Sequence, residues 1–254
     1  MVNDELHSVC MLCSNDGATL KESLNSVIGL SALRPTEVVV ADNMSTDGSA
    51  EVLREYRDRG LIKLVEKRCT RGEGRQLAFE ASSGAYIVAH MDCDDLFSAK
   101  GVDGFIAAYH ASHEGTMVMT RRKDSREASN ITIAPRGLVV ELGGWRELNW
   151  GEDWDLWARA YAAKKYSYVS YPSEYPPHLR ITVREKRYTG FSRGFGVRME
   201  KYSDAIRVRR KVFDPGEHIS IVQRMAYYGA RGSVALKRNY LHPAPPPDFW
   251  EYAT

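Results

Sequence analysis

Acidic side chains follow two apolar runs that have the length and composition of buried strands. Asp42 ends one run, and Asp92, Asp94 and Asp95 end another. Ligands of an open parallel sheet bind at the carboxyl ends of its strands. Residues two apart in an extended segment point to the same side, so we expect Asp92 and Asp94 to project together and to need a cation or a proton between them. Such oxygen ligands suit Mg²⁺ or Mn²⁺, which commonly take substrate phosphates as further ligands.

A third acidic site is the pair Glu152-Asp153. It opens an expected helix that follows a Gly-Gly-Trp turn ending at Trp145. A helix N-terminus stabilises acids, and it also keeps Asp153 ionised, as a general base requires. Each acidic group also fits an ordinary structural role as a helix cap, an Asx turn or a solvated loop. Asp42 fits such a role least well, because it directly ends a buried strand.

Strand-like and helix-like segments alternate through the first half of the chain and must position these acids. Short apolar or β-branched runs predict strands, and apolar residues at helical spacing predict helices. The expected strands cover 8–13, 37–41, 61–65, 85–91 and 116–120, and the expected helices cover 49–59, 74–83, 98–111 and 151–164, with one more after a Thr19–Glu22 capping box. We also expect a loop at 121–130, a helix start at Asp214 and a polyproline-like tail at 242–247. The pattern predicts an α/β fold with a mostly parallel central sheet flanked by helices.

The composition is that of a globular protein. Of 254 residues 43% are hydrophobic and 27% charged, which fits one large domain with a smaller extension. No stretch approaches the roughly 18–20 apolar residues of a membrane span, and the N-terminus lacks signal-peptide features. Cys10 and Cys13 lie within an expected strand, and no second Cys/His pair completes a zinc site, so we expect buried, reduced thiols. These features predict a cytoplasmic protein.

A basic segment is hidden by the net charge of +2. Residues 180–211 carry 11 Lys and Arg against 3 Asp and Glu, whereas residues 1–179 carry 20 against 26. Blocks of one charge usually meet the opposite charge. Because the segment has no recognised nucleic-acid-binding motif, we expect it to meet an anionic membrane surface or a lipid-linked acceptor, at the inner face of a membrane, and we expect no nucleic acid.

Taken in order, five segments resemble glycosyltransferase family 2, which has the GT-A fold. They are Cys13-Ser14-Asn15-Asp16, the run from Ala41 to Ser49, the run from Arg71 to Ala78, Gly84-Ala85-Tyr86-Ile87 with the acidic run that follows it, and the run from Gly151 to Leu156. The resemblance covers roughly residues 7–180. It implies a catalytic domain at 1–180, with a nucleotide-sugar half at about 1–96 and an acceptor half at about 97–180. A basic, partly helical extension follows at 181–254.

The resemblance implies an inverting glycosyltransferase that moves a sugar from a nucleotide-diphosphate donor, with UDP favoured, to a hydroxyl of a glycan or lipid-linked acceptor. It implies that Asp153 is the general base and that Asp94 binds Mn²⁺ or Mg²⁺ directly, with His178 as a further metal ligand. The implied donor-binding residues are Ser14, Asp42, Arg75, Asp92 and Cys93, and the implied acceptor-side residues are Trp145, Glu152 and Trp154. Within this set Asp42 would contact the base or ribose, and Asp92 the ribose or a metal-bound water.

The sequence also departs from the family pattern and leaves alternatives open. Leu12, Cys13 and Asn43 stand where the family often has Pro, Thr and a second Asp, so the bound base stays open. A retaining GT-A transferase is one alternative. A sugar-phosphate nucleotidyltransferase is another, although it would need a Gly-rich loop with Thr-Arg after the first strand. A non-catalytic nucleotide-sugar-binding protein is a third, and the complete acidic set argues against it.

Overall fold

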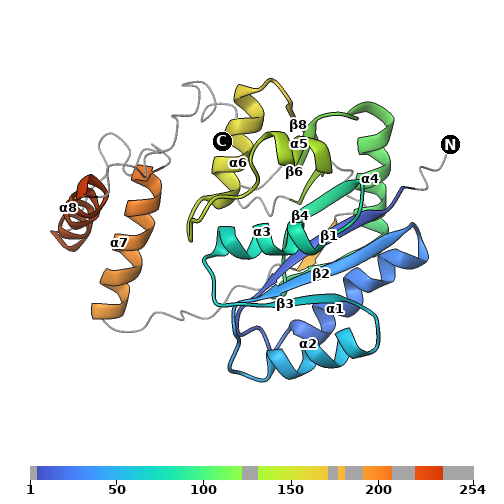
Figure 1. Cartoon of the computed structure of the whole chain (residues 1–254), viewed down its shortest axis with the longest axis horizontal. Coiled ribbons are helices and arrows are strands. Elements are labelled where there is room, and N and C mark those ends of the chain that lie inside the picture. Colours follow the sequence, from blue (N-terminus) through green and yellow to red (C-terminus); the bar gives the residue numbers. More distant parts are fainter. Residues whose placement is uncertain (1–4, 122–130, 171–176, 181–190, 208–220, 237–254) are drawn as a thin grey trace.

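The computed structural model describes residues 5–121, 131–170, 177–180, 191–207 and 221–236 (Figure 1). Its strands are β1 (His7–Cys13), β2 (Thr36–Asp42), β3 (Lys63–Glu66), β4 (Tyr86–Asp92), β5 (Leu96–Phe97), β6 (Met117–Arg121), β7 (Thr132–Pro135), β8 (Tyr166–Ser170) and β9 (His178–Arg180). Its helices are α1 (Leu20–Ile28), the 3-10 helix η1 (Gly29–Ala32), α2 (Ser49–Asp58), α3 (Arg71–Ala81), α4 (Ala99–Ser112), α5 (Arg136–Glu141), α6 (Glu152–Ala162), α7 (Phe191–Arg207) and α8 (Ile221–Leu236).

Seven of these strands form one sheet in the order β3-β2-β1-β4-β7-β6-β8. The strands β3, β2, β1 and β4 run parallel to one another, and β6 is parallel to β8. The strand β7 runs antiparallel to both β4 and β6. The predicted α/β fold, with a mostly parallel central sheet flanked by helices, is therefore confirmed.

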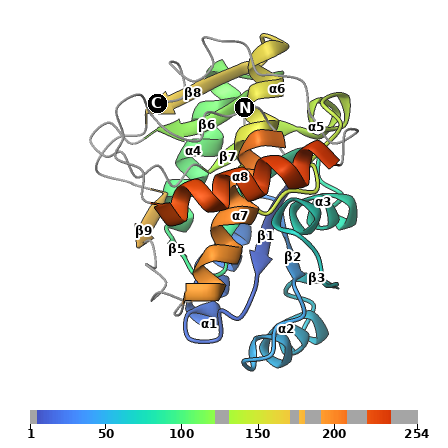
Figure 2. The ribbon, with the colours of Figure 1, turned by 90° about the vertical axis from the view of Figure 1, so that its left-hand side faces the viewer.

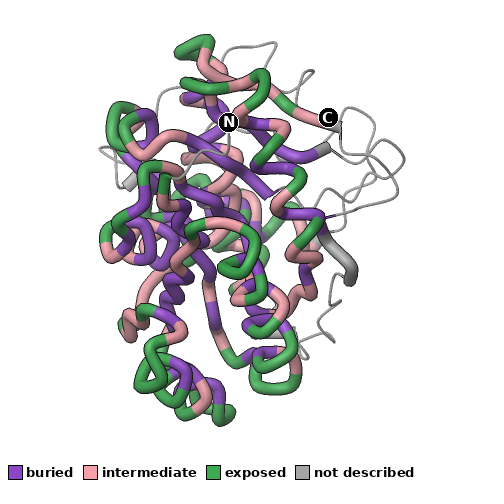
Figure 3. The backbone as a smooth tube through the Cα atoms, turned by 90° about the vertical axis from the view of Figure 1, so that its right-hand side faces the viewer, coloured by how far each residue is buried: buried purple, intermediate pink, exposed green. Residues whose placement is uncertain are grey.

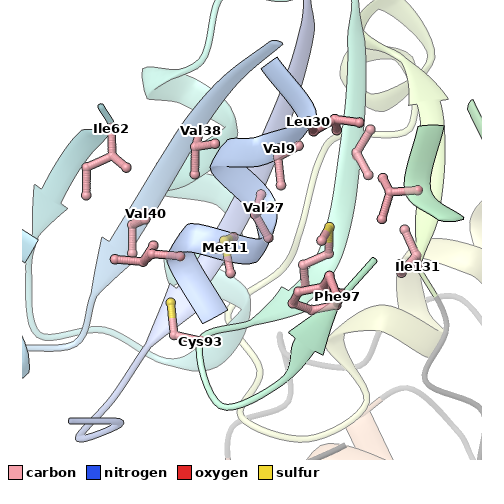
Figure 4. Packing of buried hydrophobic residues seen from close by; sticks show 14 of the residues in the cluster. Val9, Met11, Val27, Leu30, Val38, Val40, Ile62, Cys93, Phe97 and Ile131 are labelled. Carbon is pink, nitrogen blue, oxygen red and sulfur yellow. The ribbon is translucent and has the colours of Figure 1, made fainter. Parts of the chain in front are cut away.

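The sheet has an apolar core on each face. On one face, α1, α2 and α4 contribute Leu24, Leu53 and Phe105 to a cluster with residues of β1, β2 and β4 (Figure 4). On the other face, α3, α5 and α6 form a second cluster, which includes Phe79 and Trp157. The central strands are accordingly buried, while exposed residues gather on the outer sides of the helices (Figure 3). A sheet buried on both faces explains why its strands read as nearly continuous apolar runs.

Cys10 and Cys13 are buried, as expected. Cys10, Cys13 and Cys93 are buried free thiols, and Cys69 is half-buried. Cys10 belongs to one core cluster and Cys13 to the other. Their side chains therefore lie on opposite faces of β1 and cannot form a CxxC site.

One predicted helix cap is wrong. Thr19 precedes α1 but makes no side-chain cap bond; its hydroxyl instead donates to the carbonyl oxygens of Asp16 and Cys93. A capping box does form at α3, where the Thr70 hydroxyl accepts from the Glu73 N–H and the Glu73 carboxylate accepts from the Thr70 N–H. As a result α3 begins three residues earlier than expected.

The C-terminal helices α7 and α8 pack on each other around Tyr202, Ala226 and Ala230. Figures 1 and 2 place this pair beyond the carboxyl ends of β1 and β2. Of the basic segment, 181–190 and 208–211 lie outside the described residues, as do the expected loop at 122–130, the helix start at Asp214 and the tail at 242–247. Among the helices that the structure describes, none has both the length and the apolar character that a membrane crossing needs.

Candidate active site at the carboxyl edge of the sheet

Three neighbouring strands bring the two strand-end acidic clusters to one edge of the sheet. The register pairs Cys13 at the end of β1 with Asp42 at the end of β2, and Leu12 with Asp92 at the end of β4. The chain extends from β1 to β2 and β3 on one side and then returns to place β4 on the other. This edge is therefore a topological switch point, the place where open α/β sheets bind ligands.

A pocket of about 230 Å³ opens at this edge. Its walls come from the ends of β1, β2 and β4, the start of α3, the turn before α6, and α7. The polar residues that line it include Ser14, Asn43, Thr70, Arg71, Asp92, Asn149, Trp150 and Glu200. Of the predicted donor-binding residues, Ser14 and Asp92 thus border the pocket, whereas Asp42, Arg75 and Cys93 lie outside its lining.

Arg75 connects Asp92 at the end of β4 with Glu152 at the start of α6. Its guanidinium is buried, with Nε donating to Glu152 Oε1 over 3.0 Å and Nη2 donating to Asp92 Oδ1 over 3.3 Å. Within the described part of the chain, its Nη1 is buried and has no hydrogen-bond partner. One cation therefore links the end of β4 to the start of α6, and the charges of Asp92, Glu152 and Asp153 raise the Arg75 pKa against the effect of burial. A buried pair of this kind depends on both partners being present.

The start of α6 carries two adjacent acids in different surroundings. Glu152 is 2% exposed, and burial raises its pKa to about 7, with the charge of Asp153 adding to the rise and Arg75 opposing it. Asp153 is only half-buried, and its carboxylate accepts the Trp154 N–H over 2.8 Å. Both follow Gly151, whose φ of +75° suits glycine at this N-cap. Asp153 is thus the accessible carboxylate of the pair, and Glu152 the internal one.

Asp42 holds the loop that follows β2. Its side chain is fully buried, and its carboxylate accepts the Ser45 N–H over 2.9 Å and the Ser45 hydroxyl over 2.5 Å. Asp47 accepts the Ser49 N–H at the start of α2 over 3.1 Å, which is the hydrogen bond of an Asx turn. The neighbour Asn43 borders the pocket and accepts the Cys69 N–H. Asp42 thereby shapes the pocket wall from behind.

The acidic segment after β4 is a turn and not an extended strand. The Asp95 N–H donates to the Asp92 carbonyl oxygen over 3.1 Å, so the expectation of an extended backbone from Asp92 to Asp94, on which the same-side projection rested, is wrong. Cys93 lies within this turn, and its side chain is buried in the apolar core (Figure 4). Asp94 stays half-buried beside the edge of the sheet.

Two observations bear on the metal prediction. The described residues contain no group of three or more His, Cys, Asp and Glu side chains arranged to hold a metal ion. In β9, His178 pairs with Phe97 of β5. Phe97 lies three residues after Asp94 in the chain. Strands β5 and β9 form a separate two-stranded sheet, and this pairing brings the backbone of His178 close to the acidic turn.

A buried hydrogen-bonded chain connects β4 and β7 to α6 and the turn before it. The Trp145 indole N–H donates to His90 Nε2 over 3.2 Å, while His90 Nδ1 and the Trp157 indole both reach the Thr132 hydroxyl, over 2.8 and 3.1 Å. Because Nε2 accepts from Trp145, the ring proton lies on Nδ1, and burial lowers the His90 pKa well below its ordinary value. Trp145 is therefore buried under the site, and Trp154, half-buried beside Asp153, lies closer to its surface.

Part of the pocket wall was not anticipated from the sequence. Asn149, Trp150 and Glu200 belong to no motif in the sequence. Thr70 and Arg71 do carry a signal, the Thr-x-x-Glu capping box. Gly72 lies close to this wall, since a Cβ there would come within 1.9 Å of the Arg146 carbonyl oxygen.

Solved glycosyltransferases share this architecture. A mannosyltransferase from Pyrobaculum calidifontis, solved with GDP-mannose and Mn²⁺, matches 94% of this chain and 76% of its own, with a TM-score of 0.61 and 17% identity. S. aureus TarS with UDP-GlcNAc matches 89% of this chain and 72% of its own, with a TM-score of 0.58 and 15% identity. Glucosyl-3-phosphoglycerate synthase from Mycobacterium tuberculosis, with Mn²⁺, UDP and product, matches 76% and 78%, with a TM-score of 0.56 and 18% identity.

The sequence itself gives a more specific assignment. A search of the curated proteins finds no match. The family model described as "Glycosyl transferase family 2" matches residues 8–157, more than half of the 254-residue chain. The match spans β1 to the middle of α6 and so includes the strand ends, Arg75 and the Glu152-Asp153 pair. The chain therefore belongs to glycosyl transferase family 2 and is a glycosyltransferase.

Proposed function

We propose that this glycosyltransferase moves a sugar from a nucleotide-diphosphate donor, UDP-linked by preference, to a hydroxyl acceptor with inversion at the anomeric carbon. The observation that carries the proposal is the pocket at the switch point, with Asp92 on its donor side and Asp153 at the start of α6. Arg75 ties the two sides together. The three solved relatives hold GDP-mannose, UDP-GlcNAc or UDP, which supports a nucleotide-sugar donor here.

The charges of the pocket fit a donor that arrives with a divalent cation. Among the described residues, its lining carries the carboxylates of Asp92 and Glu200 and the guanidinium of Arg71, while Arg75 pairs with Asp92 from outside the lining. A diphosphate would be repelled by this lining unless a cation accompanied it. With no ready cluster of three ligands among the described residues, Mn²⁺ or Mg²⁺ would be held by Asp94, with His178 as a further ligand, and by the donor phosphates, a ligand set that both ions accept. Such an ion would offset the negative charge of the leaving nucleoside diphosphate.

The chain's own residues then have separate tasks. Ser14 and Asn43 border the donor, and Asp42 fixes their wall through Ser45. Asp153 accepts the proton of the acceptor hydroxyl, a step that typically contributes on the order of 10²–10⁴ in rate. A hydroxyl that Asp153 deprotonates would attack the anomeric carbon opposite the leaving group, and the product would then be inverted. A retaining outcome, read from the anomeric proton coupling by NMR, would refute this part.

The acceptor is proposed to be a glycan or a lipid-linked hydroxyl. Trp154, half-buried beside Asp153, offers an aromatic surface for a sugar ring. The described face of α8 exposes Met225 and Tyr228 next to Arg224 and Arg231, a combination suited to an anionic lipid surface. Loss of binding to phosphatidylglycerol vesicles in Arg224→Gln/Arg231→Gln would support a membrane-facing role, and equal binding would refute it.

The donor prediction is tested by thermal stabilisation with UDP-, GDP- and dTDP-sugars, each with and without Mn²⁺. A donor at 100 times its dissociation constant should stabilise the protein by about 2.7 kcal/mol. We expect at least one donor to raise the melting temperature, and to do so more strongly with Mn²⁺. If none of the three classes shifts the transition, a nucleotide-sugar donor is excluded at this site. Asp58→Asn, on an exposed part of α2, is a control that should respond as the wild type does.

A further inference from the structure

Three distant parts of the chain meet at the turn formed by Asn149 and Trp150. This turn borders the pocket together with Arg71 from α3 and Glu200 from α7. We propose that α7, which lies beyond the residues that the family model matches, is part of the donor site, and that Asp204 on α7 is a positioning residue that fixes this turn. The inference rests on the proposed function, because it assigns the pocket to a nucleotide-diphosphate donor.

The Asp204 carboxylate accepts hydrogen bonds from the backbone of the turn. Its Oδ2 accepts the Asn149 N–H over 2.9 Å and the Trp150 N–H over 3.1 Å, while Oδ1 accepts from Arg207 Nη1 over 3.2 Å. The side chain is 4% exposed. A carboxylate that accepts two successive N–H groups fixes both the position and the direction of the backbone. Without it, both of these part-buried backbone donors would lose their acceptor, which costs free energy.

The side chain of Asn149 extends the same contact to α3. Its Oδ1 accepts the Arg71 N–H over 3.0 Å, and its Nδ2 donates to Glu200 Oε1. The Leu148 carbonyl oxygen accepts the Gly72 N–H over 2.8 Å. The turn is therefore held on one side by the first residues of α3 and on the other by α7, and both sides are pocket walls.

Two cations, one from α3 and one from α7, lie over the Trp150 ring. The Arg71 guanidinium lies 5.5 Å from the centre of its indole ring, and the Lys201 ammonium lies 5.8 Å from it. These are cation–π distances, each of which contributes to holding the ring. The next residues along the chain are Gly151 and the acids that begin α6. A shift of the turn would therefore move the pocket wall and the proposed base together.

This arrangement predicts a defect in donor binding that loss of stability alone does not produce. We would titrate full-length protein with UDP and with GDP, each with Mn²⁺, by calorimetry at a temperature where every variant is folded. Asp204→Ala should weaken the affinity for the nucleotide that binds the wild type by about ten-fold or more, and Asp204→Asn, which keeps one acceptor oxygen, should recover part of it. The matched control is Asp103→Ala. Asp103 lies on α4, away from the pocket, and its carboxylate pairs with Arg34 over 2.5 Å. This variant should have a lower melting temperature than the wild type and the same nucleotide affinity.

The outcomes separate the two proposals. Binding of Asp204→Ala equal to that of the wild type would overturn the role of Asp204 and leave the donor site intact. If Asp204→Ala does not fold, Asp204→Asn decides, since wild-type affinity in that variant would also overturn the role. If the wild type binds neither nucleotide, the proposed function fails first, and the role of α7 in a donor site falls with it.

Discussion

Glu152 gives the clearest test of the electrostatics of the site. It is 2% exposed at the start of α6, and Arg75 Nε lies 3.0 Å from its carboxylate. Burial raises its pKa from the ordinary value of 4.5 to about 7 despite that cation. Because one pKa unit corresponds to about 1.36 kcal/mol, this shift amounts to about 3 kcal/mol of stability that depends on pH.

The sign follows from where the proton is held. Below pH 4.5 the carboxyl is protonated in both folded and unfolded chains. Between pH 4.5 and 7 the unfolded chain releases the proton and the folded protein keeps it, so stability falls as the pH rises. Above pH 7 both states are ionised and the effect levels off. The stability that Glu152 contributes is thus fully present in acid and is lost on the way to neutrality.

The perturbation is Glu152→Gln, which cannot titrate. Urea unfolding of wild type and variant from pH 4 to 8 should show the wild type losing about 3 kcal/mol relative to the variant, with most of the change between pH 4.5 and 7. Glu141→Gln, on the exposed end of α5 beside Lys165, is the control and should keep the wild-type profile. A constant difference across this range would refute the reasoning. A wild type that gains stability with pH would show instead that Arg75 holds Glu152 ionised.

Three further predictions concern the metal, the wall of the pocket and the core. Asp94→Asn should abolish the part of donor binding that depends on Mn²⁺, measured by calorimetry with and without the ion; unchanged metal dependence would contradict its role as ligand. Gly72→Ala places a Cβ 1.9 Å from the Arg146 carbonyl oxygen and should lower the free energy of unfolding in urea by about 1–3 kcal/mol. Its control is Gly104→Ala on α4, where the added Cβ meets open space and the free energy of unfolding should stay the same or rise. Trp157→Ala should cost about 3–5 kcal/mol, and a loss below about 1 kcal/mol would show that the core under α6 is not packed as described.

The sequence predicted the N-terminal half of the fold well because its strands are buried on both faces. Apolar runs ending in Asp42 and Asp92 marked both the strands and the edge where they meet. The strand β7 gave no comparable signal, since it has only four residues and α5 follows it directly. The bulge in β4 was equally hidden: the register shifts opposite Cys10, and His90 takes a φ of +62°.

The site was predicted less completely, for two physical reasons. Local patterns do not distinguish geometries, so one Thr-x-x-Glu run formed a capping box at Thr70 and the other, at Thr19, did not. Contacts between distant segments leave no pattern at all. Asp204 and Asn149 are 55 positions apart, and nothing in either segment indicates that α7 reaches the pocket. The family and fold are confirmed, while the roles assigned to individual residues stay predictions.

The central claim is that a nucleotide-sugar bound at the carboxyl edge of the sheet reacts with a hydroxyl that Asp153 deprotonates. The most direct test measures release of nucleoside diphosphate by wild type and Asp153→Asn, with the donor found in the thermal screen and its binding measured in parallel by calorimetry. We expect Asp153→Asn to lose turnover by on the order of 10²–10⁴ while binding the donor nearly as tightly as the wild type. Wild-type turnover in Asp153→Asn would contradict the assignment of the base and the account of the site that is built on it.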